Sequence, residues 1–257
     1  MKDKKMIKAF LTILFWRIWD FSIKLIWPYL GIKTKQILRD LIDSKQIIKI
    51  KINNFISKKS GVIIQVGSND GISNDHLRDF IKDTACNVYL IEPLPFLVKK
   101  LRELYKDHGN VKVLEFAILP KVDIAPFYHL NTISAKEMGK RWKSWYDQIG
   151  SFSKKHLMKH SKELVPFIKI LNIKCKPLDN VISEEGIKEI LLLNVDAEGY
   201  DVDVINTISL NKIKPWVLLF EHKHANVFDL MILLRKLKSH GYRYTVTYGD
   251  IVCFNDI

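Results

Sequence analysis

Short apolar runs alternate with helical stretches from residue 61 onward. The runs are four to six residues long, and most of them are followed by a glycine or an acidic residue. This alternation is typical of βαβ units, so it predicts an α/β fold with a mostly parallel sheet. The last two runs alternate polar and apolar positions around a turn at 248–250, which predicts a closing hairpin. The predicted strands are residues 62–66, 87–91, 111–116, 190–195, 216–220, 242–247 and 251–254, and a helix is predicted over about 73–82.

The first 60 residues have a different pattern. Residues 9–30 carry 16 apolar side chains in 22, but Arg17, Asp20 and Lys24 interrupt them. The longest uncharged stretch before Arg17 is residues 9–16, which is well short of the roughly 18 to 20 apolar residues that span a bilayer. The run leads into Trp-Arg-Ile-Trp-Asp and not into a small-residue cleavage site, so a secretory signal peptide is rejected.

A helix lying in a membrane interface fits this segment better. Trp16, Trp19 and Trp27 suit the headgroup level, and lysines near the start attract anionic lipid. We therefore expect residues 1–31 to contact an anionic membrane surface, at the cytoplasmic inner face of the cell membrane. Packing of this helix against its own domain is the alternative, because its apolar residues go nearly all round the helical wheel.

The domain boundary is predicted at Lys58-Lys59-Ser60-Gly61, after a further amphipathic helix over residues 34–57. The chain would then consist of a basic helical leader, residues 1–60, and a main domain, residues 61–257. An insert at about 130–168 mixes aromatic and basic side chains, which favours either a lid over an acceptor or an amphipathic helix with a solvated basic face. Its aromatic residues are Trp142, Trp145, Tyr146 and Phe152, and its basic residues include Lys140, Arg141, Lys143, Lys154, Lys155 and Lys159.

Charge and cysteine content narrow the function classes. The chain of 257 residues has a net charge of +13, but residues 1–60 hold 14 basic and 4 acidic side chains, a net +10. The basic excess therefore belongs to the leader, and we expect no nucleic acid partner. Cys86, Cys175 and Cys253 are widely spaced and form no CxxC, so they predict core thiols in a reducing cytoplasm and neither disulfides nor a zinc site.

Two strand ends carry the marks of a nucleotide site. Gly67-Ser68-Asn69-Asp70-Gly71 follows the first strand, and such a turn lets backbone N–H groups approach a ligand. Glu92-Pro93 follows the second strand, 25 positions beyond Gly67, where a carboxylate accepts hydrogen bonds from ribose hydroxyls. The turn is GxxxG and not GxGxxG, so a ligand with a ribose and no pyrophosphate suits it. A plain tight turn and a solvated carboxylate are the structural alternatives.

Acidic residues also follow the fourth and fifth strands. Asp196 and Glu198 could orient an acceptor hydroxyl, act as a base or hold a divalent cation, with helix capping as the structural alternative. Glu221 and His222 are further candidates for the base, although His222 also fits a plain strand-end histidine. His222 and His224 have HxH spacing without a third ligand nearby in the sequence, so a metal is not assigned.

Five segments together resemble the FkbM family of S-adenosylmethionine-dependent methyltransferases. The resemblance covers about residues 62–254, and Gln65 departs from it because an acidic residue often stands there. It implies a Rossmann-like, seven-stranded class I methyltransferase sheet with a reversed C-terminal hairpin, here preceded by N-terminal helices. The segments are Val66-Gly67-Ser68-Asn69-Asp70-Gly71, Ile91-Glu92-Pro93, Leu178-Asp179-Asn180, Asn194-Val195-Asp196-Ala197-Glu198-Gly199-Tyr200-Asp201 and Glu221.

The resemblance also implies roles. Residues 67–71 would border the methionine moiety of S-adenosylmethionine, Glu92 with Pro93 would bind the ribose, and Phe116 and Ala117 would lie by the adenine. The activity implied is O-methylation of a sugar hydroxyl in a glycan, glycolipid or related metabolite, with a saccharide or lipid-linked saccharide as acceptor. The alternatives are an idle nucleotide-binding fold that serves as a membrane adaptor and, with less support, a nucleic-acid methyltransferase.

Overall fold

The computed structural model describes most of the main domain and the first helix. The described residues are 2–26, 52, 54–56, 59–73, 75, 77–121, 123–130, 146–160 and 162–255, and the side chains of 2–5, 20–26, 160 and 162 are not among them. Trp27, Trp142 and Trp145, the basic residues at 140–143 and most of the helix predicted over 34–57 lie outside the described residues.

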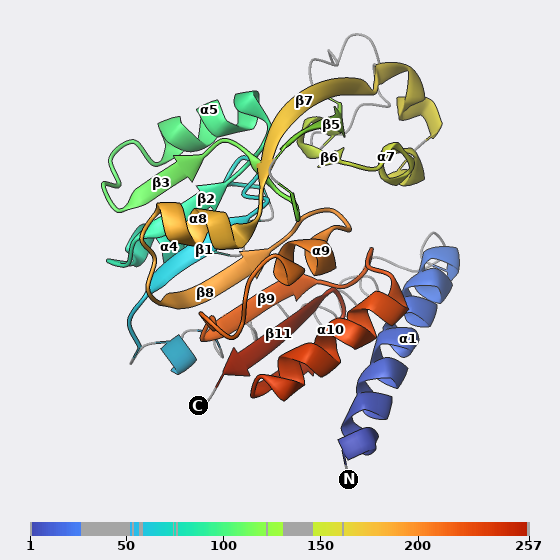
Figure 1. The fold of residues 1–257 in the computed structure, drawn as a ribbon. Coiled ribbons are helices and arrows are strands. Elements are labelled where there is room, and N and C mark those ends of the chain that lie inside the picture. Colours follow the sequence, from blue (N-terminus) through green and yellow to red (C-terminus); the bar gives the residue numbers. More distant parts are fainter. Residues whose placement is uncertain are drawn as a thin grey trace.

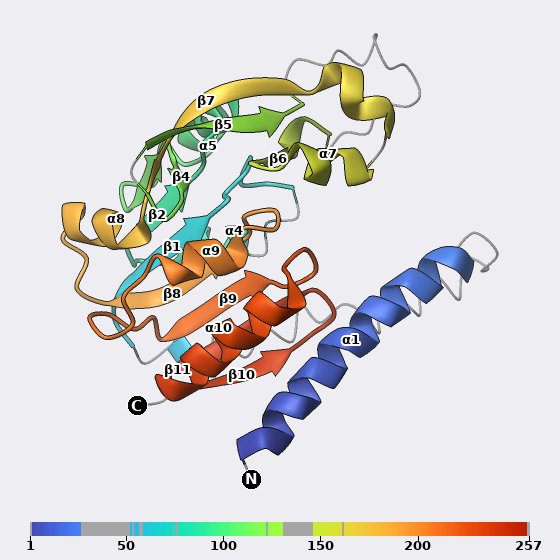
Figure 2. The same cartoon turned by 45° about the vertical axis from the view of Figure 1, so that its right-hand side comes forward.

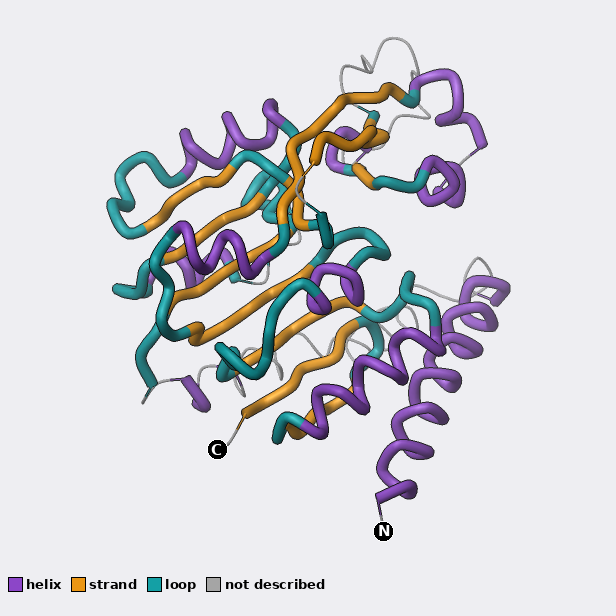
Figure 3. The backbone as a smooth tube through the Cα atoms, in the orientation of Figure 1, coloured by secondary structure: helices purple, strands orange, loops and turns teal. Residues whose placement is uncertain are grey.

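The main domain is built on a seven-stranded sheet with the order β10-β11-β9-β8-β1-β2-β3 (Figures 1 and 3). Neighbouring strands are parallel except where β11 pairs antiparallel with both β9 and β10. This confirms the predicted sheet with its reversed C-terminal hairpin. The strands are β1 (Val62–Val66), β2 (Val88–Ile91), β3 (Val111–Leu114), β8 (Ile190–Val195), β9 (Val217–Glu221), β10 (Tyr242–Val246) and β11 (Asp250–Asn255).

Helices cover both faces of this sheet because its central strands are apolar on both sides. In β1, Ile63 packs into one core cluster and Ile64 into the other, as expected from the two-residue period of a strand. Helices α8, α9 and α10 cover the face of Ile64, whereas α4 and α5 cover the face of Ile63. Their bounds are α4 (Arg78–Asp83), α5 (Pro95–Leu104), α8 (Leu178–Glu184), α9 (Asp201–Asn206) and α10 (Val227–Ser239).

A second sheet of four strands, in the order β4-β7-β5-β6, stands above the carboxyl ends of the central strands (Figures 1 and 2). Its long strands β5 and β7 pair antiparallel. Sequence patterns did not predict this sheet, and the expected insert at 130–168 supplies only part of the region. The elements are β4 (Ala117–Ile118), β5 (Asp123–His129), β6 (Gly150–Ser151), β7 (Lys169–Lys176), α7 (Lys154–His160) and the short helices η3 (Tyr146–Gln148) and η4 (Lys162–Phe167).

The N-terminal helix α1 (Lys2–Ile26) lies beside α10 and β10 at the edge of the main sheet (Figure 2). Met6, Ala9 and Ile13 are buried in the main core cluster, and Arg17 Nη2 donates to the carbonyl oxygens of His222 at 2.8 Å and Ala225 at 2.7 Å. One face of the helix therefore packs on its own domain. The other face exposes a set of large apolar side chains: Ile7, Phe10, Leu11, Leu14, Phe15 and Ile18.

The described helices include none that is long and apolar enough to cross a membrane.

The three cysteines are free thiols, with Cys175 and Cys253 buried and Cys86 partly buried.

Candidate active site

A cavity of about 330 Å³ opens at the carboxyl ends of β1, β2 and β8. The second sheet closes it from above, since residues of β5 and of the segment before α7 form part of its wall. Asp70, Gly71, Glu221 and His222 are not in the wall. The sequence-predicted site residues that line it are Gly67, Ser68, Asn69, Glu92, Pro93, Phe116, Ala117, Asp196 and Glu198.

The turn after β1 approaches the turn after β8 so closely that position 67 requires glycine. Gly67 has φ +78°, and a Cβ added there would overlap the carbonyl oxygen of Asp196. The N–H of Asp196 donates to the carbonyl of Val66 at 3.0 Å, which holds the two turns together. The first glycine of the GxxxG turn therefore brings the β1 and β8 loops into contact at the cavity.

Asp70 and Gly71 shape this turn without lining the cavity. Asp70 Oδ1 accepts hydrogen bonds from the N–H groups of Ile72 at 2.9 Å and Ser73 at 2.8 Å, and Oδ2 accepts one from Gln148 Nε2 at 2.8 Å. Burial acts to raise the pKa of Asp70, but the hydrogen bonds from Ser73 and Ile72, together with the charge of Lys100, outweigh burial and leave the pKa below its ordinary value. Asp70 thus fixes the loop as a carboxylate, and Gly71 takes a left-handed φ of +68°.

Glu92 is buried at the end of β2 and is held by two backbone donors. Its Oε2 accepts from the N–H of Asn69 and its Oε1 from the N–H of Leu94, both at 3.0 Å. Burial raises the pKa of Glu92 to about 7, although the two hydrogen bonds act to lower it. The carboxyl group is therefore fixed in position and titrates near neutral pH.

These residues fit the cofactor that the sequence resemblance implies. Each Glu92 oxygen keeps a second lone pair after accepting its backbone hydrogen bond, and Glu92 forms part of the cavity wall, so two ribose hydroxyls can donate to it. Phe116 and Ala117 add an apolar wall that suits a flat aromatic ring. At Gly67 no side chain separates the backbone from the cavity.

The loop after β8 carries acidic groups toward the cavity. Asp196 and Glu198 line the wall, and Glu198 adopts a left-handed backbone with φ +49°, which is uncommon for a residue with a Cβ. Asp201 accepts hydrogen bonds from the N–H groups of Ala197 at 3.4 Å and Gly199 at 3.3 Å, so it stabilises the conformation of this loop. Burial, with a smaller effect of the Glu198 charge, raises the pKa of Asp201 to about 7.

Glu221 and His222 lie behind this loop. Burial, and then the charge of Asp196, raises the pKa of the Glu221 carboxyl well above its ordinary value. His222 has no exposed surface, and its Nε2 lies 3.0 Å from the carbonyl oxygen of Thr247. Burial lowers the pKa of His222, which favours the neutral ring. His222 thus lies in the core just after β9 and outside the cavity wall, and a catalytic role for it stays a prediction.

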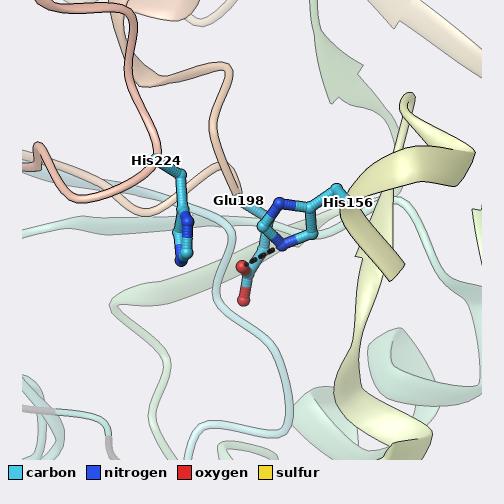
Figure 4. Close-up of side chains that lie close together, drawn as sticks. All are labelled: His156, Glu198 and His224. Atoms are coloured by element: carbon cyan, nitrogen blue, oxygen red, sulfur yellow. Dashed lines mark hydrogen bonds and ion pairs between the residues drawn. The ribbon is translucent and has the colours of Figure 1, made fainter. Parts of the chain in front are cut away.

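Three side chains from separate segments meet beside the cavity (Figure 4). They are His156 of α7, Glu198 of the β8 loop and His224 of the β9 loop. His156 Nε2 lies 2.9 Å from Glu198 Oε2, and the two imidazole rings are 4.8 Å apart and nearly perpendicular. Glu221 Oε2 lies 3.7 Å from His224 Nε2.

Part of the wall comes from residues that the motifs did not indicate. Gln148, Gly150 and Phe152 precede α7, and Phe127 lies in β5. Gly150 is held close to the Phe127 ring, where a Cβ would collide with it. The aromatic residues of the insert were a signal for Phe152, but nothing in the local pattern marks Gln148 or Gly150.

The known proteins that this chain resembles in sequence are methyltransferases. The family model described as Methyltransferase FkbM domain matches residues 65–244. A curated 2-O-methyltransferase, NoeI of Sinorhizobium fredii (strain NBRC 101917 / NGR234), is 24% identical over 189 residues, which are 73% of this chain and 73% of NoeI.

Solved structures show weaker likeness. The crystal structure of the methyltransferase FkbM from Methylobacillus flagellatus KT has a TM-score of 0.47 at 15% identity over 76% of this chain, and this chain spans 43% of its length. The precorrin-6y C5,15-methyltransferase from Geobacter metallireducens GS-15 has a TM-score of 0.41 at 8% identity, over 81% of this chain and 88% of that chain. Both scores are low, so the fold assignment rests on the sheet order of this chain. With the family model matching most of the chain, this protein belongs to the FkbM family of S-adenosylmethionine-dependent methyltransferases.

Proposed function

We propose that this protein transfers a methyl group from S-adenosylmethionine to a sugar hydroxyl of a glycan, a glycolipid or a related metabolite. The observation that carries the proposal is that one cavity is lined both by a buried carboxylate suited to ribose, Glu92, and by two further acidic side chains, Asp196 and Glu198. The likeness to NoeI, a 2-O-methyltransferase, supports transfer to oxygen.

The proposed chemistry needs a positioned acceptor and a route for one proton. S-adenosylmethionine supplies an electrophilic methyl group: its carbon–sulfur bond breaks as the acceptor oxygen attacks, so the sulfonium becomes a neutral thioether and the hydroxyl proton must leave. In this proposal Asp196 or Glu198 accepts that proton, and the other carboxylate orients the hydroxyl. Glu92 and the 67–71 turn hold the cofactor side.

Aromatic side chains support a sugar as the acceptor. Phe127 and Phe152 pack edge to face at 5.0 Å, and Phe152 packs in the same way on Tyr200 at 5.4 Å. The three residues line the cavity beside the acidic loop. Aromatic faces suit the apolar face of a pyranose ring, while carboxylates accept its hydroxyl hydrogens.

Labelled methyl transfer tests the acceptor class. The full-length chain is incubated with methyl-labelled S-adenosylmethionine and a panel of oligosaccharides, glycolipids and non-sugar alcohols, and mass spectrometry locates the methyl group. We expect label on a sugar oxygen. Transfer to a non-sugar hydroxyl alone, or to nitrogen or carbon, would overturn the proposed acceptor.

We also propose that helix α1 attaches the protein to the inner face of the cell membrane. Its buried face is occupied by its own domain, but Leu11, Phe15 and Ile18 are more than half exposed on the other face. Burial of these side chains in lipid would add to attraction between the basic leader and anionic headgroups, at about 1 kcal/mol for each basic residue near the surface.

Sedimentation with vesicles tests this attachment. The full-length chain should sediment with phosphatidylglycerol-containing vesicles, and a Phe15→Ser, Ile18→Ser double variant should sediment less. Ile170→Ser is the matched control, because Ile170 is also exposed but lies in β7, away from the helix. Equal sedimentation of the double variant and the control would contradict attachment through this face.

A further inference from the structure

The two histidines and the glutamate beside the cavity form a ligand set that the sequence does not bring together. His156 and Glu198 are 42 residues apart, and His224 comes from the loop of a third segment. One potential ligand atom from each residue lies within 4.8 Å of the others. Figure 4 shows the three side chains gathered at one place. Two imidazole nitrogens and one carboxylate oxygen are a common donor set for a first-row divalent cation.

The spacing of these atoms is close to that of a loaded site. Ligand atoms at about 2.0–2.2 Å from a metal ion lie roughly 3–3.5 Å from one another. His156 Nε2 and Glu198 Oε2 are already 2.9 Å apart, so mainly His224 would have to approach, by up to about 1–2 Å. His224 stands in the loop between β9 and α10, outside helix and strand.

The backbone between the ligands leaves room for their approach. Gly199 has φ +97°, and a Cβ added there would lie 3.4 Å from His224 Cβ and 4.0 Å from His156 Nδ1. A larger side chain at position 199 would stand between the two histidines. Glu198, the residue before Gly199, also has a left-handed backbone, and its carboxylate lies 2.9 Å from His156 Nε2.

We propose that His156, Glu198 and His224 bind one divalent cation with a preference for mixed nitrogen and oxygen ligands, such as Zn²⁺ or Mn²⁺. Three protein ligands leave coordination positions open, and Glu198 lines the cavity, so an open position can face the acceptor. This role rests on the proposed function. The cation would bind the acceptor oxygen and lower the pKa of its hydroxyl, Glu198 would serve as a ligand, and Asp196 would accept the proton.

Metal binding to the full-length chain, without a histidine tag, tests the proposal directly. The chain is stripped with chelator and titrated with Zn²⁺ and Mn²⁺ separately, and bound metal and affinity are measured. We expect one ion per chain, tighter binding of Zn²⁺ than of Mn²⁺, and an affinity at least about 100-fold weaker in His224→Ala, His156→Ala and Glu198→Gln. His240→Ala is the matched control, since His240 follows α10 and bonds to Lys236.

Two results would overturn the proposal: absence of a stoichiometric ion, or unchanged affinity in His224→Ala. His224→Ala decides the case if the buried His156→Ala fails to fold, because the His224 side chain is 31% exposed. A chain that binds the ion at these residues but methylates no sugar supports this site and overturns the proposed acceptor. A chain that methylates sugars but binds no ion overturns this site and supports the proposed acceptor.

Discussion

The two halves of the cavity differ in how much of the chain is needed to build them. The proposed cofactor half consists of residues 67–69 of the turn after β1, Glu92, and Phe116 and Ala117 after β3, and the main contacts of Glu92 are hydrogen bonds to nearby backbone. The proposed acceptor half combines the β8 loop with Phe152 of the inserted region, and His156 of the same region contacts Glu198 beside the cavity. The first half is encoded in short motifs, whereas the second depends on how distant segments pack.

This difference suggests that the two halves can be changed separately. Backbone donors and a glycine turn leave little freedom for a different cofactor. The acceptor half is built from loops, and loops tolerate substitution while the sheet below them stays the same. Substitutions in one half should therefore change one step of the reaction and spare the other.

The largest expected effect comes from Gly67→Ala. The new Cβ would overlap the carbonyl of Asp196 and force the β1 and β8 loops apart, so cofactor binding should no longer be detected. The free energy of unfolding should fall by about 3 kcal/mol. Gly109→Ala is the control, because a Cβ at Gly109 meets no atom within 4 Å. Calorimetry measures cofactor binding, and denaturant unfolding measures the free energy of unfolding. Normal cofactor binding by Gly67→Ala would contradict the role assigned to the 67–71 turn.

Asp196→Asn should mainly affect turnover. Loss of the proton acceptor should lower kcat by about 100-fold or more, while the dissociation constant of S-adenosylmethionine stays within about twofold. Asp123→Asn, an exposed change in β5, should leave both values unchanged. Steady-state kinetics on the true acceptor measures kcat. A variant that keeps full turnover would remove Asp196 from the mechanism.

Glu92→Ala should act on the cofactor. Losing charge-assisted hydrogen bonds to the ribose should cost about 1.5–3 kcal/mol, which is roughly 10- to 150-fold in affinity. The change also leaves the N–H groups of Asn69 and Leu94 without an acceptor, so thermal unfolding must show that the variant is folded. Glu115→Ala, at an exposed position beyond β3, is the control. Wild-type affinity in a folded Glu92→Ala protein would rule out the ribose role.

The smallest effect is a pH dependence of cofactor affinity. Because burial raises the pKa of Glu92 to about 7, the group is largely protonated at pH 6 and largely ionised at pH 8. Only the ionised form accepts from both ribose hydroxyls, so affinity should rise by about 10-fold over this range. In Glu92→Gln the rise should disappear. A rise that persists in that variant would mean that another group controls it.

The cofactor half could be predicted from sequence because its signals are local. A strand followed by GxxxG, and a second strand ending in Glu92-Pro93, place these residues at one sheet edge whatever the loops do. The alternation of strands and helices predicted a mostly parallel sheet, the turn at 248–250 predicted the closing hairpin, and the family resemblance implied that this hairpin is reversed. The second sheet did not, because β5 and β7 pair across about 40 residues of chain and neither has a turn signal that joins them.

The acceptor half shows why a strand end alone is not enough. Glu221 ends β9 and His222 follows it, but neither is in the cavity wall, and His222 turns into the core and bonds to Thr247. His224, two residues later, meets Glu198 through the loop, and its partner His156 lies in a helix that no motif marks. The sequence predicts which residues lie at this edge of the sheet, but not the direction in which each side chain points.

The most direct test of two separable halves is calorimetric titration of S-adenosylmethionine into Glu92→Ala and Glu198→Gln under identical conditions. The affinity for S-adenosylmethionine should fall about 10- to 150-fold in Glu92→Ala and stay within about twofold of wild type in Glu198→Gln. An equal loss in both variants, or a loss confined to Glu198→Gln, would contradict the separation of the two halves.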